Sequence, residues 1–140
     1  MPVIKLKQIK WPPNGLHLWA EILINNHKLF AVVDSGASQT VVDAQMAETL
    51  NLKPVKSKHV VSTGVGGPVN NSMAVIYNLQ IGSVQLQKVK VVLIDFTTIN
   101  EAYAAIGKKK VHCILGGDIL KRTAAIINYQ NSTLKVSLKK

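Results

Sequence analysis

Apolar and polar positions alternate near the start of the chain, and this alternation predicts a β-hairpin. From Leu16 to Ile24 every even-numbered residue is aliphatic, which is the two-residue period of a strand with one buried face. Residues 25–27 are polar and can turn the chain, and residues 28–33 form a mainly apolar run that ends at Asp34. The second strand of this hairpin therefore presents Asp34 at its end.

The segment after this hairpin predicts a short helix. Val42, Met46 and Leu50 recur every four residues, as on one face of a helix, and Pro54 follows where such a helix would stop. Asp43 stands at its start, where a short acidic side chain is typical of a helix N-cap.

Further strands and turns follow towards the middle of the chain. Residues 60–68 predict a strand that runs into a glycine-rich tip, and residues 73–81 lead back from it. Gly82-Ser83 suits a tight two-residue turn, after which residues 84–96 form one long apolar strand. The apolar parity switches within this strand, which predicts a bulge near residues 87–88.

The last third of the chain continues the pattern of short elements. Residues 98–101 match a capping box for a helix that ends near Gly107. Residues 111–115 predict a strand, residues 118–122 a short helix, and residues 124–138 a final hairpin. Short strands separated by frequent turns, with two or three brief helices, predict a closed, mainly β domain.

Composition fits one folded domain. The chain has 140 residues, of which 47% are hydrophobic, so it can build a core. No apolar stretch approaches the roughly 18–20 residues that span a bilayer, so no membrane partner is expected. The N-terminus lacks the apolar run of a secretory signal, so a cytoplasmic protein is expected if Met1 is the natural start. The single cysteine, Cys113, excludes an intrachain disulfide and predicts a buried small side chain.

The chain is strongly basic, with a formal net charge of +10 from 17 Lys and Arg against 7 Asp and Glu. Such a charge favours anionic partners. The lysines are dispersed, however, and no basic stretch is interleaved with the aromatic rings that single-strand binders use. We therefore expect a solvated basic surface and no nucleic-acid partner. A basic nucleic-acid-binding barrel is the rival, and retention on DNA at physiological ionic strength would favour it.

Two short motifs carry the candidate chemistry. Residues 34–36 read Asp-Ser-Gly at the end of an apolar strand, where the glycine allows the chain to fold back and amides can face the carboxylate. The triplet alone is typical of ordinary turns. Residues 114–116, which lie 80 positions further on, read Ile-Leu-Gly at the end of another strand and precede a helix. The glycine-rich tip at residues 64–68 lies between the two motifs.

These three features, in this order and spacing, resemble the retropepsin-like aspartic protease family, in particular its compact bacterial members. The resemblance extends from about Leu16 to Leu138. It implies a closed retropepsin-like β-barrel with two or three short helices, formed by residues 16–140 after an N-terminal extension of residues 1–15. Serine at position 35 replaces the commoner threonine of the family, and Gly117 stands where a bulkier residue is usual.

The resemblance implies an aspartic endopeptidase that acts on peptides or proteins and needs no cofactor or metal. A retropepsin domain has one catalytic aspartate, so a homodimer brings two together, and the pair shares a proton because two like charges cannot both ionise easily. A flap closes over the substrate. On this mapping the catalytic residue is Asp34, the turn residues that touch substrate are Ser35, Gly36 and Ala37, and the flap tip contains Gly66 and Gly67.

Several alternatives remain open. The main rival is a catalytically idle retropepsin-like module for dimerisation or peptide binding, against which the presence of Asp34 and the flap glycines argues. Asp118 is interpreted as a helix N-cap rather than a second acid. The four histidines show no ligand spacing with one another or with Cys113, so no metal site is expected. Apolar residues alternate with polar ones at both termini, which predicts edge strands that pair across a dimer two-fold axis. The apolar residues of these strands are Ile4, Leu6, Leu134, Val136 and Leu138.

Overall fold

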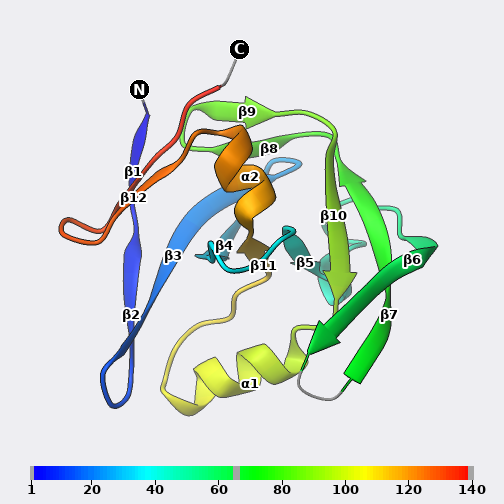
Figure 1. Cartoon of the computed structure of the whole chain (residues 1–140), viewed down its shortest axis with the longest axis horizontal. Helices are drawn as coiled ribbons and strands as arrows, with labels where there is room; N and C mark the ends of the chain where they lie inside the picture. Colours follow the sequence, from blue (N-terminus) through cyan, green and yellow to red (C-terminus); the bar gives the residue numbers. More distant parts are fainter. Residues whose placement is uncertain (1, 65–66, 139–140) are drawn as a thin grey trace.

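Two sheets make up the chain, and the larger one curls into a half-barrel (Figure 1). The computed structural model describes residues 2–64 and 67–138, with the backbone alone between residues 56 and 71. The larger sheet contains, in spatial order, β6 (Val55–Gly64), β7 (Gly67–Ile76), β10 (Val89–Ile94), β5 (Val41–Asp43), β11 (Cys113–Leu115), β4 (His27–Val33), β3 (Gly15–Ile24), β8 (Leu79–Ile81) and β9 (Val84–Leu86), with β2 (Lys7–Trp11) paired to β3. The smaller sheet contains β1 (Val3–Lys5), β13 (Thr133–Lys135) and β12 (Ile126–Asn128).

The helices are short. They are the 3-10 helix η1 (Ala44–Met46) and the α-helices α1 (Thr97–Ala105) and α2 (Gly117–Arg122). The predicted mainly β class with two or three brief helices is confirmed. Among the helices of the described residues, none has the length and apolar character needed to cross a bilayer.

The predicted first hairpin is formed by β3 and β4. Asn25 and Asn26 between them both have positive φ, 48° and 70°, as a two-residue type I′ turn requires. β11 pairs with β4 in parallel, with Leu115 opposite Val33, and pairs with β5 in the antiparallel sense. The ends of β4 and β11 therefore lie side by side, and each is followed by a glycine-containing turn.

The predicted helix over residues 42–50 is wrong. Val42 lies in β5, which pairs with β10 on one side and β11 on the other, and helical geometry is limited to η1. Val42 and Leu50 are both buried in the core, so their spacing reflects burial from two different elements. Pairing on both sides of β5 outweighed the weak helical preference of this segment.

The long strand predicted over residues 84–96 is divided at residues 87–88. β9 pairs with β8, whereas β10 pairs with β7 and β5. The switch in apolar parity thus marks a corner between two partners, not a bulge within one strand, and Lys88 makes the corner with a φ of 55°. The strand predicted over residues 73–81 divides in the same way, between Ile76 and Leu79.

The capping box predicted at residues 98–101 does not form. α1 begins at Thr97, and the carboxylate of Asp95 accepts hydrogen bonds from the Thr97 backbone N–H at 2.8 Å and from its hydroxyl at 2.6 Å. These two bonds hold the pKa of Asp95 below its usual value. Gly107, with a φ of 75°, ends the helical segment as predicted.

Buried side chains form two clusters on opposite faces of the larger sheet. In β4, Leu29 and Ala31 belong to the main cluster, whereas Phe30 and Val32 pack against the second, as the alternation of a strand requires. The second cluster also contains Trp19 of β3 and Tyr103 of α1. The part of the other face of β3 that carries His17 and Trp19 is therefore covered by α1.

The two termini pair within one chain. β1 runs antiparallel to β13, with Ile4 opposite Leu134, and Leu6, Leu134 and Val136 are buried in the main cluster. Much of the apolar face of these strands is therefore buried within one chain, although Leu138 is exposed; their pairing across a two-fold axis stays a prediction. The domain division at residue 15 stays a prediction, but β1 and β2 show that the preceding segment is built into both sheets.

Candidate active site

Asp34 lies at the carboxyl end of β4 and begins a tight turn. Its backbone N–H donates to the carbonyl of Leu115 at 3.0 Å, which ties the turn to β11. Gly36 N–H donates to Oδ1 of Asp34 at 2.9 Å, and Ala37 N–H donates to the Asp34 carbonyl at 3.2 Å. Asp34 and Ala37 are half-buried, while Ser35 and Gly36 are exposed. The predicted site residues of this turn thus form one accessible rim.

The turn after β11 supports the Asp34 turn from behind. Gly117 N–H donates to the Ala37 carbonyl at 2.7 Å. A Cβ at Gly116 would lie 2.7 Å from the backbone of Gln39, closer than side chains approach, whereas a Cβ at Gly117 would meet nothing nearer than 3.5 Å. The close approach of the two turns therefore requires glycine at position 116 and not at position 117.

Asp118 belongs to this support and is not the N-cap of α2. The N-cap is Gly116, and Asp118 lies in the first turn of the helix. Its carboxylate accepts hydrogen bonds from the Thr40 backbone N–H at 3.1 Å and from the Thr40 hydroxyl at 2.8 Å. The Thr40 hydroxyl oxygen in turn accepts from Gly116 N–H at 3.1 Å. Asp118 is thus a structural carboxylate that locks the two turns together.

A hollow of about 370 Å³ opens beside Asp34. Aliphatic side chains make most of its wall, and polar groups stand at its rim and at one side. The lining residues are Leu16, His17, Leu18, Val32, Val33, Asp34, Ser35, Ile99, Tyr103, Ile114, Ile127 and Tyr129. Within the described part of the chain, Asp34 is the one carboxylate that lines it.

His17 and Tyr103 form a polar pair in the wall of this hollow. His17 Nδ1 and the Tyr103 hydroxyl oxygen lie 2.7 Å apart in a hydrogen bond. The imidazole stacks on Trp11 with a centroid distance of 4.9 Å, and the Tyr103 ring packs edge-on against both. Burial raises the pKa of Tyr103, and the negative charge of Asp34 acts in the same direction. No periodicity connects residues 86 positions apart, so the sequence could not predict this pair.

The predicted flap corresponds to the β6–β7 hairpin. Gly67 is the first residue of β7 and pairs with Gly64 of β6. Gly66 lies outside the described residues. The assignment of Gly66 and Gly67 to substrate contact therefore stays a prediction.

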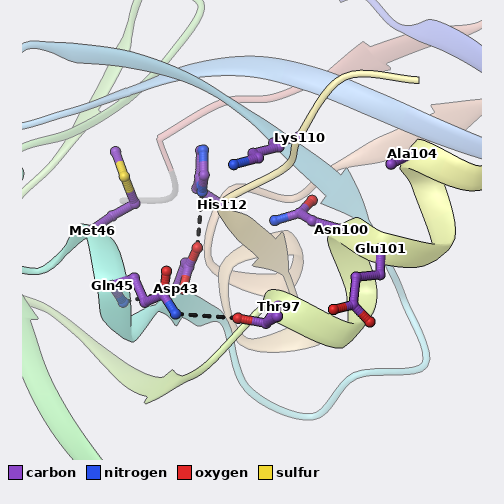
Figure 2. A pocket seen from close by; sticks show the side chains of 9 residues that line it. All are labelled: Asp43, Gln45, Met46, Thr97, Asn100, Glu101, Ala104, Lys110 and His112. Carbon is purple, nitrogen blue, oxygen red and sulfur yellow. Dashed lines mark hydrogen bonds and ion pairs between the residues drawn. The ribbon is translucent and has the colours of Figure 1, made fainter. Parts of the chain in front are cut away.

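A second cavity, of about 440 Å³, lies between η1 and α1 (Figure 2). Asp43 is one of its lining residues, and Oδ2 of Asp43 lies 2.9 Å from Nδ1 of His112. Asp43 Oδ1 accepts from Gln45 N–H at 3.1 Å and from Phe96 N–H at 3.3 Å. Asp43 is thus a helix N-cap as predicted, but it caps the short η1 and not a helix over residues 42–50. The lining residues are Asp43, Gln45, Met46, Thr97, Asn100, Glu101, Ala104, Lys110 and His112. Because both oxygens of Asp43 have partners, this carboxylate holds three segments together.

Cys113 lies in the main core. It is fully buried in β11 as a free thiol, as predicted, and burial raises its pKa well above the usual range. A thiol held protonated in this way is a packing group, not a nucleophile.

Comparison with known proteins points to one family. The sequence profile described as aspartyl protease matches residues 20–119. DNA damage-inducible protein 1 of Kluyveromyces lactis is 28% identical over 122 residues, which cover 86% of this chain and 26% of that protein. The chain therefore spans about a quarter of the length of this relative.

Solved structures show the same fold. A retropepsin-like aspartic protease from Rickettsia conorii superposes with a TM-score of 0.59 at 17% identity, covering 94% of this chain and 90% of that one. EIAV protease, in complex with the inhibitor HBY-793, gives a TM-score of 0.56 at 21% identity, covering 81% and 92%. The retropepsin-like fold expected from the sequence is confirmed.

Proposed function

Because the chain belongs to the aspartyl protease family, we propose that it is an endopeptidase in which two copies of the chain each supply one Asp34. The observation that carries this proposal is the state of the Asp34 carboxylate. It follows β4, which is paired on both sides, stands half-exposed at the rim of a hollow, and accepts a single hydrogen bond from the described residues. Its remaining lone pairs are available for water or substrate.

The chemistry needs a second carboxylate. Peptide hydrolysis by this route uses a general base to deprotonate water and a general acid to protonate the leaving amine. A single Asp34 cannot be both at once. Two copies related by a two-fold axis bring two Asp34 side chains together, and the pair retains one proton because two adjacent negative charges repel. The homodimer is therefore part of the proposed mechanism.

In the proposed reaction, the ionised Asp34 takes a proton from a water molecule, whose oxygen attacks the peptide carbonyl carbon. The protonated Asp34 donates a hydrogen bond to the carbonyl oxygen and then supplies the proton that the amine needs as the C–N bond breaks. We assign Ser35, Gly36 and Ala37 to contacts with the substrate backbone, since this turn is accessible beside Asp34. Gly66 and Gly67 would close over the peptide.

The test of this proposal is digestion of a diverse peptide library at acidic and at neutral pH. We expect the wild type to cleave peptides and Asp34→Asn to leave them intact while keeping the same circular dichroism and unfolding midpoint. Comparable cleavage by the two proteins would refute the assignment of Asp34. No cleavage by either protein, together with a stable dimer, would favour the idle module for dimerisation or peptide binding.

The dimer is tested by dilution and by mixing. Specific activity should fall as the protein is diluted below its dimer dissociation constant, with mass followed in parallel by light scattering. Excess Asp34→Asn should inhibit the wild type, since mixed dimers hold one aspartate. Full activity from a species that stays monomeric at every concentration would exclude the two-chain mechanism.

A further inference from the structure

The hollow beside Asp34 has an uneven lining. Val32, Ile99 and Ile114 contribute aliphatic wall, while His17 places an imidazole in the same space. The volume of about 370 Å³ corresponds to roughly a dozen water molecules at ~30 Å³ each. It can therefore take a long side chain whose stem meets the aliphatic wall and whose end meets a polar group.

The imidazole of His17 is held in one orientation. Its Nδ1 is engaged by the Tyr103 hydroxyl at 2.7 Å, and one ring face stacks on Trp11 with an interplanar angle of 16°. Tyr103 is itself only 3% exposed, so its hydroxyl cannot swing away into solvent. A group fixed in this way loses little conformational freedom when it binds a ligand, which favours selective recognition.

The Tyr103 contact also determines what His17 offers. The hydrogen bond at 2.7 Å admits the Tyr103 hydroxyl as donor and Nδ1 as acceptor. In a neutral imidazole the hydrogen then resides on Nε2, and a protonated imidazole carries one there as well. In the described part of the chain Nε2 has no hydrogen-bond partner. In both of these states His17 presents an N–H donor at Nε2.

We propose that His17 is a specificity-determining residue, which selects substrates with a hydrogen-bond acceptor at the end of a long side chain next to the scissile bond. Glutamine fits best, because its stem packs on the aliphatic wall and its carbonyl oxygen accepts from Nε2–H. Glutamate shares the acceptor, but its charge is repelled by Asp34 in the same hollow. This inference rests on the proposed protease function and names the substrate side chain of that site.

The test uses pairs of peptides that are identical except at one position, where one peptide has glutamine and the other has methionine. The two side chains have similar length. Each position of the peptide is varied in turn. Dissociation constants are measured on Asp34→Asn, which binds without turnover, and kcat/KM on the wild type. A neutral hydrogen bond changes affinity by about 3- to 10-fold. We expect one position next to the scissile bond to favour glutamine by this factor, and the ratio to fall to about one when His17→Phe is added.

Control variants separate this role from general damage. His27→Phe makes the same replacement at an exposed histidine of β4 and should leave the glutamine-to-methionine ratio unchanged. Tyr103→Phe removes only the hydroxyl that orients the imidazole, so it should lower the ratio even if His17→Phe does not fold. A ratio near one in the parent protein, or a ratio that both variants leave unchanged, would overturn the proposal.

The same measurements distinguish the two levels of inference. Cleavage by the wild type without any preference for glutamine would leave the protease function standing and remove the role of His17. Selective binding of glutamine peptides to Asp34→Asn, without cleavage by the wild type, would leave the subsite standing and remove the protease function.

Discussion

Asp34 and Asp43 are carboxylates nine positions apart that stand in very different surroundings. Asp34 is half-exposed at the rim of a hollow, and among the described residues its side chain accepts one hydrogen bond, from Gly36 N–H. Asp43 is 4% exposed and is bonded to Gln45 N–H, Phe96 N–H and the imidazole of His112. Each lies at the end of a strand, so the strand does not account for the difference.

The difference teaches how to separate a carboxylate that is available to ligands from a structural one. A buried carboxylate is tolerable only when its oxygens are hydrogen-bonded, and those bonds then hold the surrounding segments in place. A carboxylate with unused lone pairs at an accessible rim can instead exchange a proton with water or substrate. Asp118, bonded twice to Thr40, belongs with Asp43.

The sharpest break in this comparison should come from Asp34→Asn. Removing the acid and the base from both halves of the pair should lower kcat/KM on the order of 10³-fold or more. The free energy of unfolding should stay within about 0.5 kcal/mol of the wild type, because Asp34 is accessible and makes few contacts. Peptide cleavage and urea unfolding measure the two effects. A large loss of stability would place Asp34 with the structural carboxylates.

Asp43→Ala should show the opposite behaviour. Two backbone N–H groups and His112 lose their shared acceptor, which should lower the free energy of unfolding by about 2–3 kcal/mol. Glu101→Ala is the matched control, since Glu101 is an exposed carboxylate on the same cavity; its effect should stay within about 0.5 kcal/mol. Denaturant titration measures the free energy of unfolding of both variants. Equal values for the two variants would contradict the structural role of Asp43.

Neighbouring glycines behind the Asp34 turn sharpen the comparison further. Gly116→Ala places a Cβ 2.7 Å from the Gln39 backbone, so it should lower stability by about 1–3 kcal/mol and reduce activity by displacing the turn. Gly117→Ala has room for the methyl group and should be neutral or slightly stabilising, because alanine favours the first turn of α2. Thermal unfolding and peptide cleavage test the pair. Equal losses in both variants would argue against close packing of the two turns.

The smallest effect concerns pH and Tyr103. Its pKa is raised in the folded chain above the ordinary 10.0, so the unfolded chain loses this proton first as the pH rises. The contribution of protonated Tyr103 to the free energy of unfolding is therefore fully present below pH 10 and is lost as the pH rises through the folded-state pKa. Tyr103→Phe should show a smaller alkaline decline. Because the charge of Asp34 contributes to the shift, Asp34→Asn should move the phenolate absorbance titration of Tyr103 back towards the ordinary value; an unmoved titration would show that Asp34 is electrostatically remote.

The sequence by itself determined the local hairpins and the turn that begins at Asp34. The alternation of β3, the Asn25-Asn26 turn and the Asp-Ser-Gly motif are patterns over a few consecutive residues, and backbone geometry converts them directly into structure. The relation of the Ile-Leu-Gly motif to the Asp34 turn, 80 positions away, was expected from the family resemblance and not from local geometry.

Tertiary structure alone decided which strands became neighbours and which polar groups found partners. Val42 joined a strand because β10 and β11 lie on both sides of it. Asp118 bound Thr40 across 78 positions, and His17 bound Tyr103 across 86. Hydrophobic periodicity reports which face of an element is buried but not what buries it. Contacts between distant residues depend on how the sheet curls and on where α1 packs. Hydrophobic periodicity along the chain does not predict either feature.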